Sequence, residues 1–228
     1  EKTDWQIVNS WLGTLYPELR DTSNYKTMIS YVDPDKLTGF YERRQQALDE
    51  FLEVSGQVGA EKEFLHQIER KVEKPFHYEW VEGWSTLLGS MVADLGVVMA
   101  LFLGIVLSSL FAGEWHDNTS TLVLTTRNGW GKIALAKILT GLAFTVELFA
   151  LLAVSNVISQ LFFMGTAGWD MPIQNIKLIA VAPMNMLQAE IYEYAFVLLG
   201  AIGFAGIVMF ISAAVKNNVL TLLLSLAV

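Results

Sequence analysis

Residues 87–111 form an apolar run that contains a single charged side chain, Asp94. About 20 mostly apolar residues, each rising 1.5 Å along a helix, cross the roughly 30 Å hydrocarbon core of a bilayer. Trp84 and Trp115 flank the run, where aromatic side chains favour the interface between lipid and water. The run therefore predicts a membrane-spanning helix, and it constrains the solvent in which the rest of the chain folds.

Charged residues are distributed unevenly along the chain. Residues 1–86 contain 10 of the 15 Lys and Arg residues and 16 of the 23 Asp and Glu residues. Two further apolar runs, at about 137–163 and 193–215, are long enough to span a membrane. We therefore expect an all-α, polytopic membrane helix bundle, in which a polar helical domain at 1–86 precedes a transmembrane domain at 87–228.

The polar region itself should be helical. Apolar residues between Trp5 and Leu15 predict a short amphipathic helix that ends near Pro17. Helical periodicity predicts a longer helix over about 36–54, and a second amphipathic stretch at 64–72 stops before a proline. The last two segments are typical of a helical hairpin.

Several functional classes are disfavoured by the composition. The net charge of −6 over residues 1–86 argues against nucleic acid as a partner, because phosphate contacts need a basic surface. The chain has no cysteine, and its three histidines lack the paired spacing of a metal site. No Gly-x4-Gly-Lys-Ser/Thr motif is present to hold phosphate. We therefore expect no metal, no cofactor and no catalytic residue in this chain.

Basic residues predict the orientation in the membrane, because Lys and Arg are enriched in short cytoplasmic loops. The long connection at 165–193 contains only Lys177, and its apolar part at 176–181 is compatible with an interfacial, a re-entrant or a surface position. The short loop at 112–136 and the residue after it contribute Arg127, Lys132 and Lys137. We expect 112–136 in the cytoplasm and residues 1–86 outside the cell.

The loop at 112–136 also carries a motif. The motif consists of Phe111, Glu114, Thr119, an apolar patch at Leu122 to Leu124, Thr125-Thr126, Gly129, Lys132 and Lys137. This string resembles the first cytoplasmic loop of ABC-2 type permeases, the membrane subunits of ABC exporters. Asn118, Arg127 and Trp130 stand where Gly, Pro and Arg are frequent in that family.

The resemblance implies partners and a place in the cell. It implies a multi-pass protein of the plasma membrane, paired with a second permease subunit and with a separate ATP-binding subunit that holds ATP and Mg. It also implies one helix before Glu1 and an incomplete end, since the apolar run at 219–228 is too short to cross. In relatives this loop docks on the ATPase, and the implied coupling residues are Glu114, Thr119, Leu122, Arg127, Lys132 and Lys137. Without the resemblance, an ordinary cytoplasmic turn explains the loop equally well.

Two carboxylates and three glycines inside the apolar runs need separate explanations. Asp94 and Glu147 are costly in hydrocarbon and indicate either a polar substrate path or interfacial carboxyl groups bonded to a neighbouring helix. The glycines Gly200, Gly203 and Gly206 favour close helix packing, with a hinge or dimer seam as the alternative. We expect transport by alternating access. The alternatives are a membrane receptor whose exterior domain binds a ligand, and a membrane enzyme that uses the two carboxylates.

Overall fold

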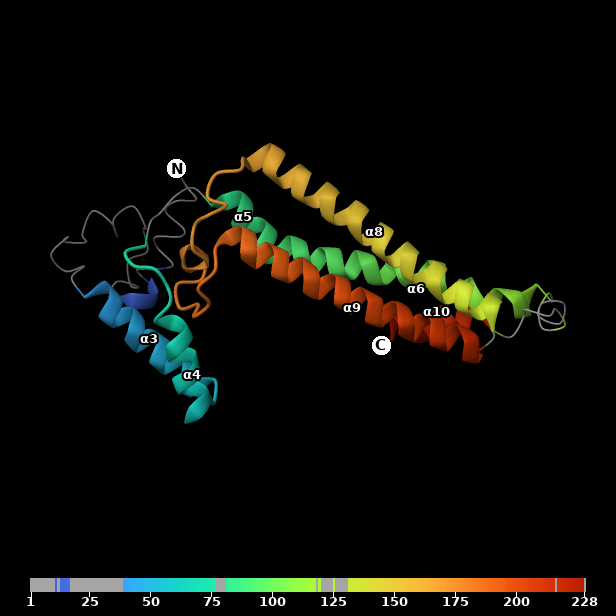
Figure 1. Ribbon diagram of the computed structural model, residues 1–228, viewed down its shortest axis with the longest axis horizontal. Helices are drawn as coiled ribbons and strands as arrows, with labels where there is room; N and C mark the ends of the chain where they lie inside the picture. Colours follow the sequence, from blue (N-terminus) through green and yellow to red (C-terminus); the bar gives the residue numbers. More distant parts are fainter. Residues whose placement is uncertain are drawn as a thin grey trace. The chain divides into compact units, whose positions relative to one another are not determined.

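The computed structural model describes residues 11, 13–16, 39–76, 81–117, 119, 125, 131–215 and 217–227, and most of these residues are helical (Figure 1). No strand occurs in these ranges, where Pro172 and Asn185 form one isolated antiparallel bridge. The predicted all-α class is therefore confirmed. The residues group into two compact units, 1–85 with 166–189 and 86–165 with 190–228.

The first unit contains two short amphipathic helices, α3 (Phe40–Val54) and α4 (Ala60–Glu69). Gly39 precedes α3 with a φ of 85°, a left-handed conformation that a side chain would strain. α4 begins earlier than the predicted stretch at 64–72, because the turn between the helices closes at Gly59. Residues 36–38 and most of the predicted helix before Pro17 lie outside the described residues.

The connection at 166–189 belongs to the first unit. It contains a short 3-10 helix, η4 (Ile173–Asn175), and it buries Leu178 against Leu15 and Tyr16. The Trp84 indole donates a hydrogen bond of 3.4 Å to the Thr166 carbonyl. The apolar part of the connection thus contributes Leu178 to a small core of the first unit.

The second unit is built on three helices that are long and apolar enough to cross a membrane. They are α6 (Val92–His116), α8 (Lys132–Met164) and α9 (Met186–Val215), and α10 (Asn218–Leu226) is shorter. A short helix, α5 (Glu82–Thr86), and one π-helical turn, η3 (Leu87–Met91), lead directly into α6.

The three predicted spans are confirmed as helices, with shifted ends. The first span lies at Val92–Trp115, whereas α8 begins five residues and α9 seven residues before the predicted 137 and 193. Hydropathy marks only the apolar part of a helix, while backbone hydrogen bonding continues into its polar ends. The terminal α10 begins at Asn217, whose side chain accepts a hydrogen bond from the Leu220 amide and caps the helix.

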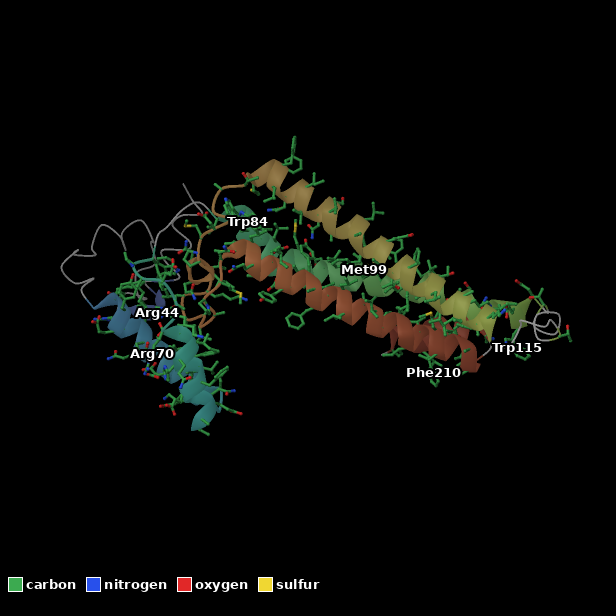
Figure 2. All side chains as sticks on the ribbon, viewed as in Figure 1. Arg44, Arg70, Trp84, Met99, Trp115 and Phe210 are labelled. Atoms are coloured by element: carbon green, nitrogen blue, oxygen red, sulfur yellow. The ribbon has the colours of Figure 1, made fainter. Side chains whose placement is uncertain are left out.

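The core of the second unit lies where α6, α8 and α9 face one another, around Met99 of α6 (Figure 2). Gly141 of α8 lies close to α9, since an added Cβ would be 2.6 Å from the Met209 sulfur. On another face of α6, Gly104 leaves room for Ser225 of α10. Small residues therefore allow close helix contacts at these two points, as is usual between membrane helices. The buried side chains come from Leu95, Met99, Leu103, Leu107, Ala153, Ala201, Ala205, Val208 and Met209.

Candidate coupling junction

An ion pair joins the end of α6 to the beginning of α8. The Lys137 ammonium lies 2.6 Å from a carboxylate oxygen of Glu114, and both side chains are partly exposed. The same ammonium donates a hydrogen bond of 2.7 Å to the Leu110 carbonyl and lies 5.0 Å from the centre of the Phe111 ring. One lysine of α8 therefore holds the last turns of α6 through charge, backbone and aromatic contacts together.

A serine joins α9 to the same part of α6. The Ser212 hydroxyl is fully buried, donates to the Ser108 carbonyl at 2.7 Å and accepts from the amides of Phe111 and Ala112. The Ser108 carbonyl and the Ala112 amide are also a helical i to i+4 pair of α6, so the hydroxyl bonds both groups of one helical turn. These bonds fix α9 to α6 at that turn.

These contacts define a junction of three helices, made by Glu114 of α6, Lys137 and Gly141 of α8, and Ser212 of α9. Lys137 and Gly141 lie one turn apart on α8, and an added Cβ at Gly141 would meet Met209 of α9. The junction lies at the ends of α6 and α8 that residues 117–131 join in the sequence. A displacement of these helix ends would therefore reach all three long helices through direct contacts.

The structure places the predicted coupling residues as follows. Glu114 and Lys137 pair with each other, whereas the sequence assigned both to contact with another subunit. Thr119 donates its amide to the Glu114 carbonyl at 3.0 Å, and Lys132 is exposed at the first residue of α8. Leu122 and Arg127 lie outside the described residues.

Asp94 and Glu147 are both exposed on the outer surface of their helices. Asp94 lies in the first turn of α6, and Glu147 lies near the middle of α8. An ionised carboxylate on a lipid-facing surface costs about 2.5 to 3.5 kcal/mol near a helix centre. Glu147 therefore needs cover from outside this chain, or a water-filled path beside it, if α8 spans a bilayer.

The three glycines of α9 also face away from the chain. An added Cβ at Gly200, Gly203 or Gly206 would meet no other atom within 4 Å, whereas the interleaved Ala201 and Ala205 are buried. Gly200 lines an apolar groove of about 250 Å³ whose other walls include Met99 and Leu103 of α6. Close packing at these glycines therefore has no partner within the described part of the chain.

A buried acidic residue that the sequence analysis did not single out lies near the beginning of α9. Glu190 is 3% exposed, and neither of its carboxylate oxygens makes a hydrogen bond. Tyr194 lies one helical turn further along α9, and its buried hydroxyl likewise makes no hydrogen bond. The signal was available in the sequence, because Glu190 and Tyr194 are four residues apart and thus on one helix face.

No group of three or more metal-ligating side chains occurs in the described ranges. No family model, no curated protein and no solved structure matches this chain. The family resemblance of the loop at 112–136 thus stays a prediction from its motif.

Proposed function

We propose that this chain is the membrane subunit of an ATP-driven exporter, a permease of the ABC-2 type. The observation that supports this proposal is the junction of Glu114, Lys137, Gly141 and Ser212. It links three helices of membrane-spanning length at the end where the motif-bearing connection leaves them. A transporter driven by a separate ATPase needs such a link, because motion generated outside the membrane has to reach several helices at once.

In the proposed mechanism, residues 112–136 face the cytoplasm and dock on the ATP-binding subunit. Closure of that subunit around ATP and Mg pushes the connection, and the junction transmits the push to α6, α8 and α9 as a rigid-body tilt. The helices then alternate between inward-open and outward-open arrangements. In this mechanism residues 1–86 lie outside the cell. The chain itself carries out no covalent chemistry.

A second permease subunit would complete the membrane part. Among the described residues, no neighbour packs on the exposed glycines of α9, and no ion pair is formed by the exposed Glu147 of α8. A second copy packed against these faces would supply partners. The substrate path would then run between the subunits, with Glu147 and Asp94 lining it. Glu190 is a further candidate, because buried carboxyl groups in membrane helices are functional more often than structural.

The test is co-expression with the ATP-binding subunit of an ABC exporter from the same genome. We expect the two proteins to copurify, and the chain to change the rate of ATP hydrolysis. Charge reversal at the coupling segment, Glu114→Lys with Arg127→Glu, should weaken the complex. Glu63→Lys with Arg70→Glu makes the same charge changes at exposed positions of the first unit and should leave it intact.

Two results would contradict the proposal. One is a chain that retains no ATP-binding protein. The other is a coupling variant that copurifies with the ATPase and stimulates it as the unaltered chain does.

A membrane receptor is the second candidate function. The observation that favours it is a cavity within the first unit that is large enough for a small ligand. Ligand binding without any effect on an ATPase would support a receptor over a permease.

A further inference from the structure

A cavity of about 480 Å³ opens in the first unit, between the segment after α4 and the connection at 166–189. Small-molecule sites in proteins usually have volumes of about 300 to 1,000 Å³. The apolar part of its wall is contributed by Val72, Pro75, Met171, Pro172, Pro183 and Met184. Its polar part includes Lys71, Glu73, Asp170 and Gln174.

The wall that carries Gln174 is held in place by a buried arginine. Arg44 of α3 is 1% exposed and donates hydrogen bonds to the carbonyls of Leu178 at 2.8 Å and Ala180 at 3.0 Å. Its third contact is the buried carboxylate of Glu69 on α4. The connection is thus attached to both helices of the first unit, and the cavity wall is a fixed part of the fold.

Gln174 has one polar atom without a partner. Its amide nitrogen donates to the carbonyls of Ala180 and Ala182, both at 2.9 Å, which closes the loop that follows η4. Its amide oxygen is fully buried and accepts no hydrogen bond, although the residue lines the cavity. Buried acceptors are nearly always satisfied, so this oxygen indicates a missing donor.

The other polar groups of the wall do not supply that donor. Asn185 and Gln188 bond each other's backbone amides at the beginning of α9, and the amides of Ile173 and Met186 bond carbonyls of the same connection. Glu73 and Asp170 are exposed acids near the cavity, against one cation, Lys71. Negative charge therefore exceeds positive charge in this wall, with two acids against one lysine.

We propose that the cavity binds an ammonium group carried on an apolar body. The ammonium donates to the Gln174 amide oxygen, Glu73 and Asp170 attract its charge, and the apolar body packs on the proline and methionine side chains. The proposal concerns the first unit only and stands whether or not the second unit transports a substrate.

The experiment uses the full chain in phosphatidylcholine nanodiscs and three water-soluble probes of one shape. Phenethylammonium offers charge and N–H donors, its N,N,N-trimethyl analogue offers charge alone, and phenylpropionate carries the opposite charge. Saturation-transfer NMR should detect phenethylammonium binding, with weaker binding of the trimethyl analogue and none of phenylpropionate. Empty nanodiscs correct for partition into lipid. Equal binding of all three probes, or no binding of phenethylammonium, overturns the proposal.

Two matched variants locate the site. Glu73→Gln with Asp170→Asn should weaken phenethylammonium binding roughly three- to tenfold, because two exposed carboxylates lose their attraction. Glu61→Gln with Glu63→Gln removes the same charge from exposed positions on α4 and should change nothing. Equal affinities for the two variants would contradict the assignment. Nanodiscs that contain phosphatidylethanolamine show whether the natural ligand is a lipid headgroup or a soluble amine. If this lipid competes with phenethylammonium, the ligand is a headgroup; if it does not compete, the ligand is a soluble amine.

Discussion

The two units place polar and apolar side chains in opposite ways. The first unit buries Leu48 and Leu52 and leaves most of its charges outside. The second unit exposes large apolar side chains, among them Phe162 at 80% and Phe210 at 74%, the latter on the outer face of α9 (Figure 2). An exposed apolar surface of this kind is unfavourable in water and favourable in lipid.

The two units also differ in the kind of polar side chain that they bury. The second unit buries small hydroxyls that bond carbonyls of their own helix, such as Thr145 to Gly141 and Thr221 to Asn217, both at 2.8 Å. These bonds satisfy the side chain without water and allow close helix contact. The first unit instead buries a full ion pair, Arg44 with Glu69. The first unit thus buries and exposes side chains as expected for a protein in water, and the second unit does so as expected for a protein in hydrocarbon.

The largest effect should come from breaking the buried ion pair. Arg44→Met leaves the buried Glu69 with only the exposed Lys74 as an ionic partner and removes two carbonyl contacts. The change should destabilise the first unit by up to about 3 to 5 kcal/mol. Hydrogen exchange of α3 and α4 in the full chain measures it. Arg70→Met, at an exposed residue just after α4 (Figure 2), should change stability by less than about 0.5 kcal/mol. Equal effects of the two variants would show that burial of Arg44 has no energetic role.

The second prediction tests close packing in the second unit. Gly141→Ala places a methyl group 2.6 Å from the Met209 sulfur and should cost about 1 to 3 kcal/mol by overpacking, reduced if the methionine moves. Gly203→Ala meets nothing within 4 Å and should be neutral or stabilising by up to about 1 kcal/mol through helix propensity. Unfolding in detergent titrated with dodecyl sulfate compares them. A more harmful change at Gly203 would instead indicate that this face is already packed against a partner.

A smaller effect is expected from acid. Burial alone would raise the pKa of the Glu69 carboxyl, but hydrogen bonds and charge from Arg44 and Lys74 outweigh it and hold this pKa below 4.5. A lowered folded-state pKa stabilises the fold at pH above the unfolded value, and this contribution is lost as pH falls through the folded value. The first unit should therefore loosen below about pH 4.5, while α6 and α9 keep their helical signal. Glu69→Gln should flatten this dependence, and an unchanged acid transition in that variant would refute it.

Sequence patterns predicted the parts of this fold that depend on local periodicity. Three spans, a helix ending at Val54 and its helical neighbour all follow from apolar spacing in short windows. Contacts between distant residues were not predictable in this way, since Arg44 bonds Leu178 across 134 positions. The sequence likewise drew attention to Asp94 and Glu147, which are exposed, and passed over Glu190, which is buried. Apolar runs identify spans, but burial of a carboxylate is decided by the neighbouring helix.

The most direct test of the central claim, that the junction couples the long helices to an ATPase, is a charge exchange at the Glu114 to Lys137 pair. Glu114→Lys and Lys137→Glu each break the pair, and the double variant restores it with opposite polarity. In complexes reconstituted with the ATP-binding subunit, each single variant should lower stimulated ATP hydrolysis by roughly two- to fivefold, and the double variant should recover most of it. Unchanged hydrolysis in both single variants, or a double variant no better than either single one, would contradict the account.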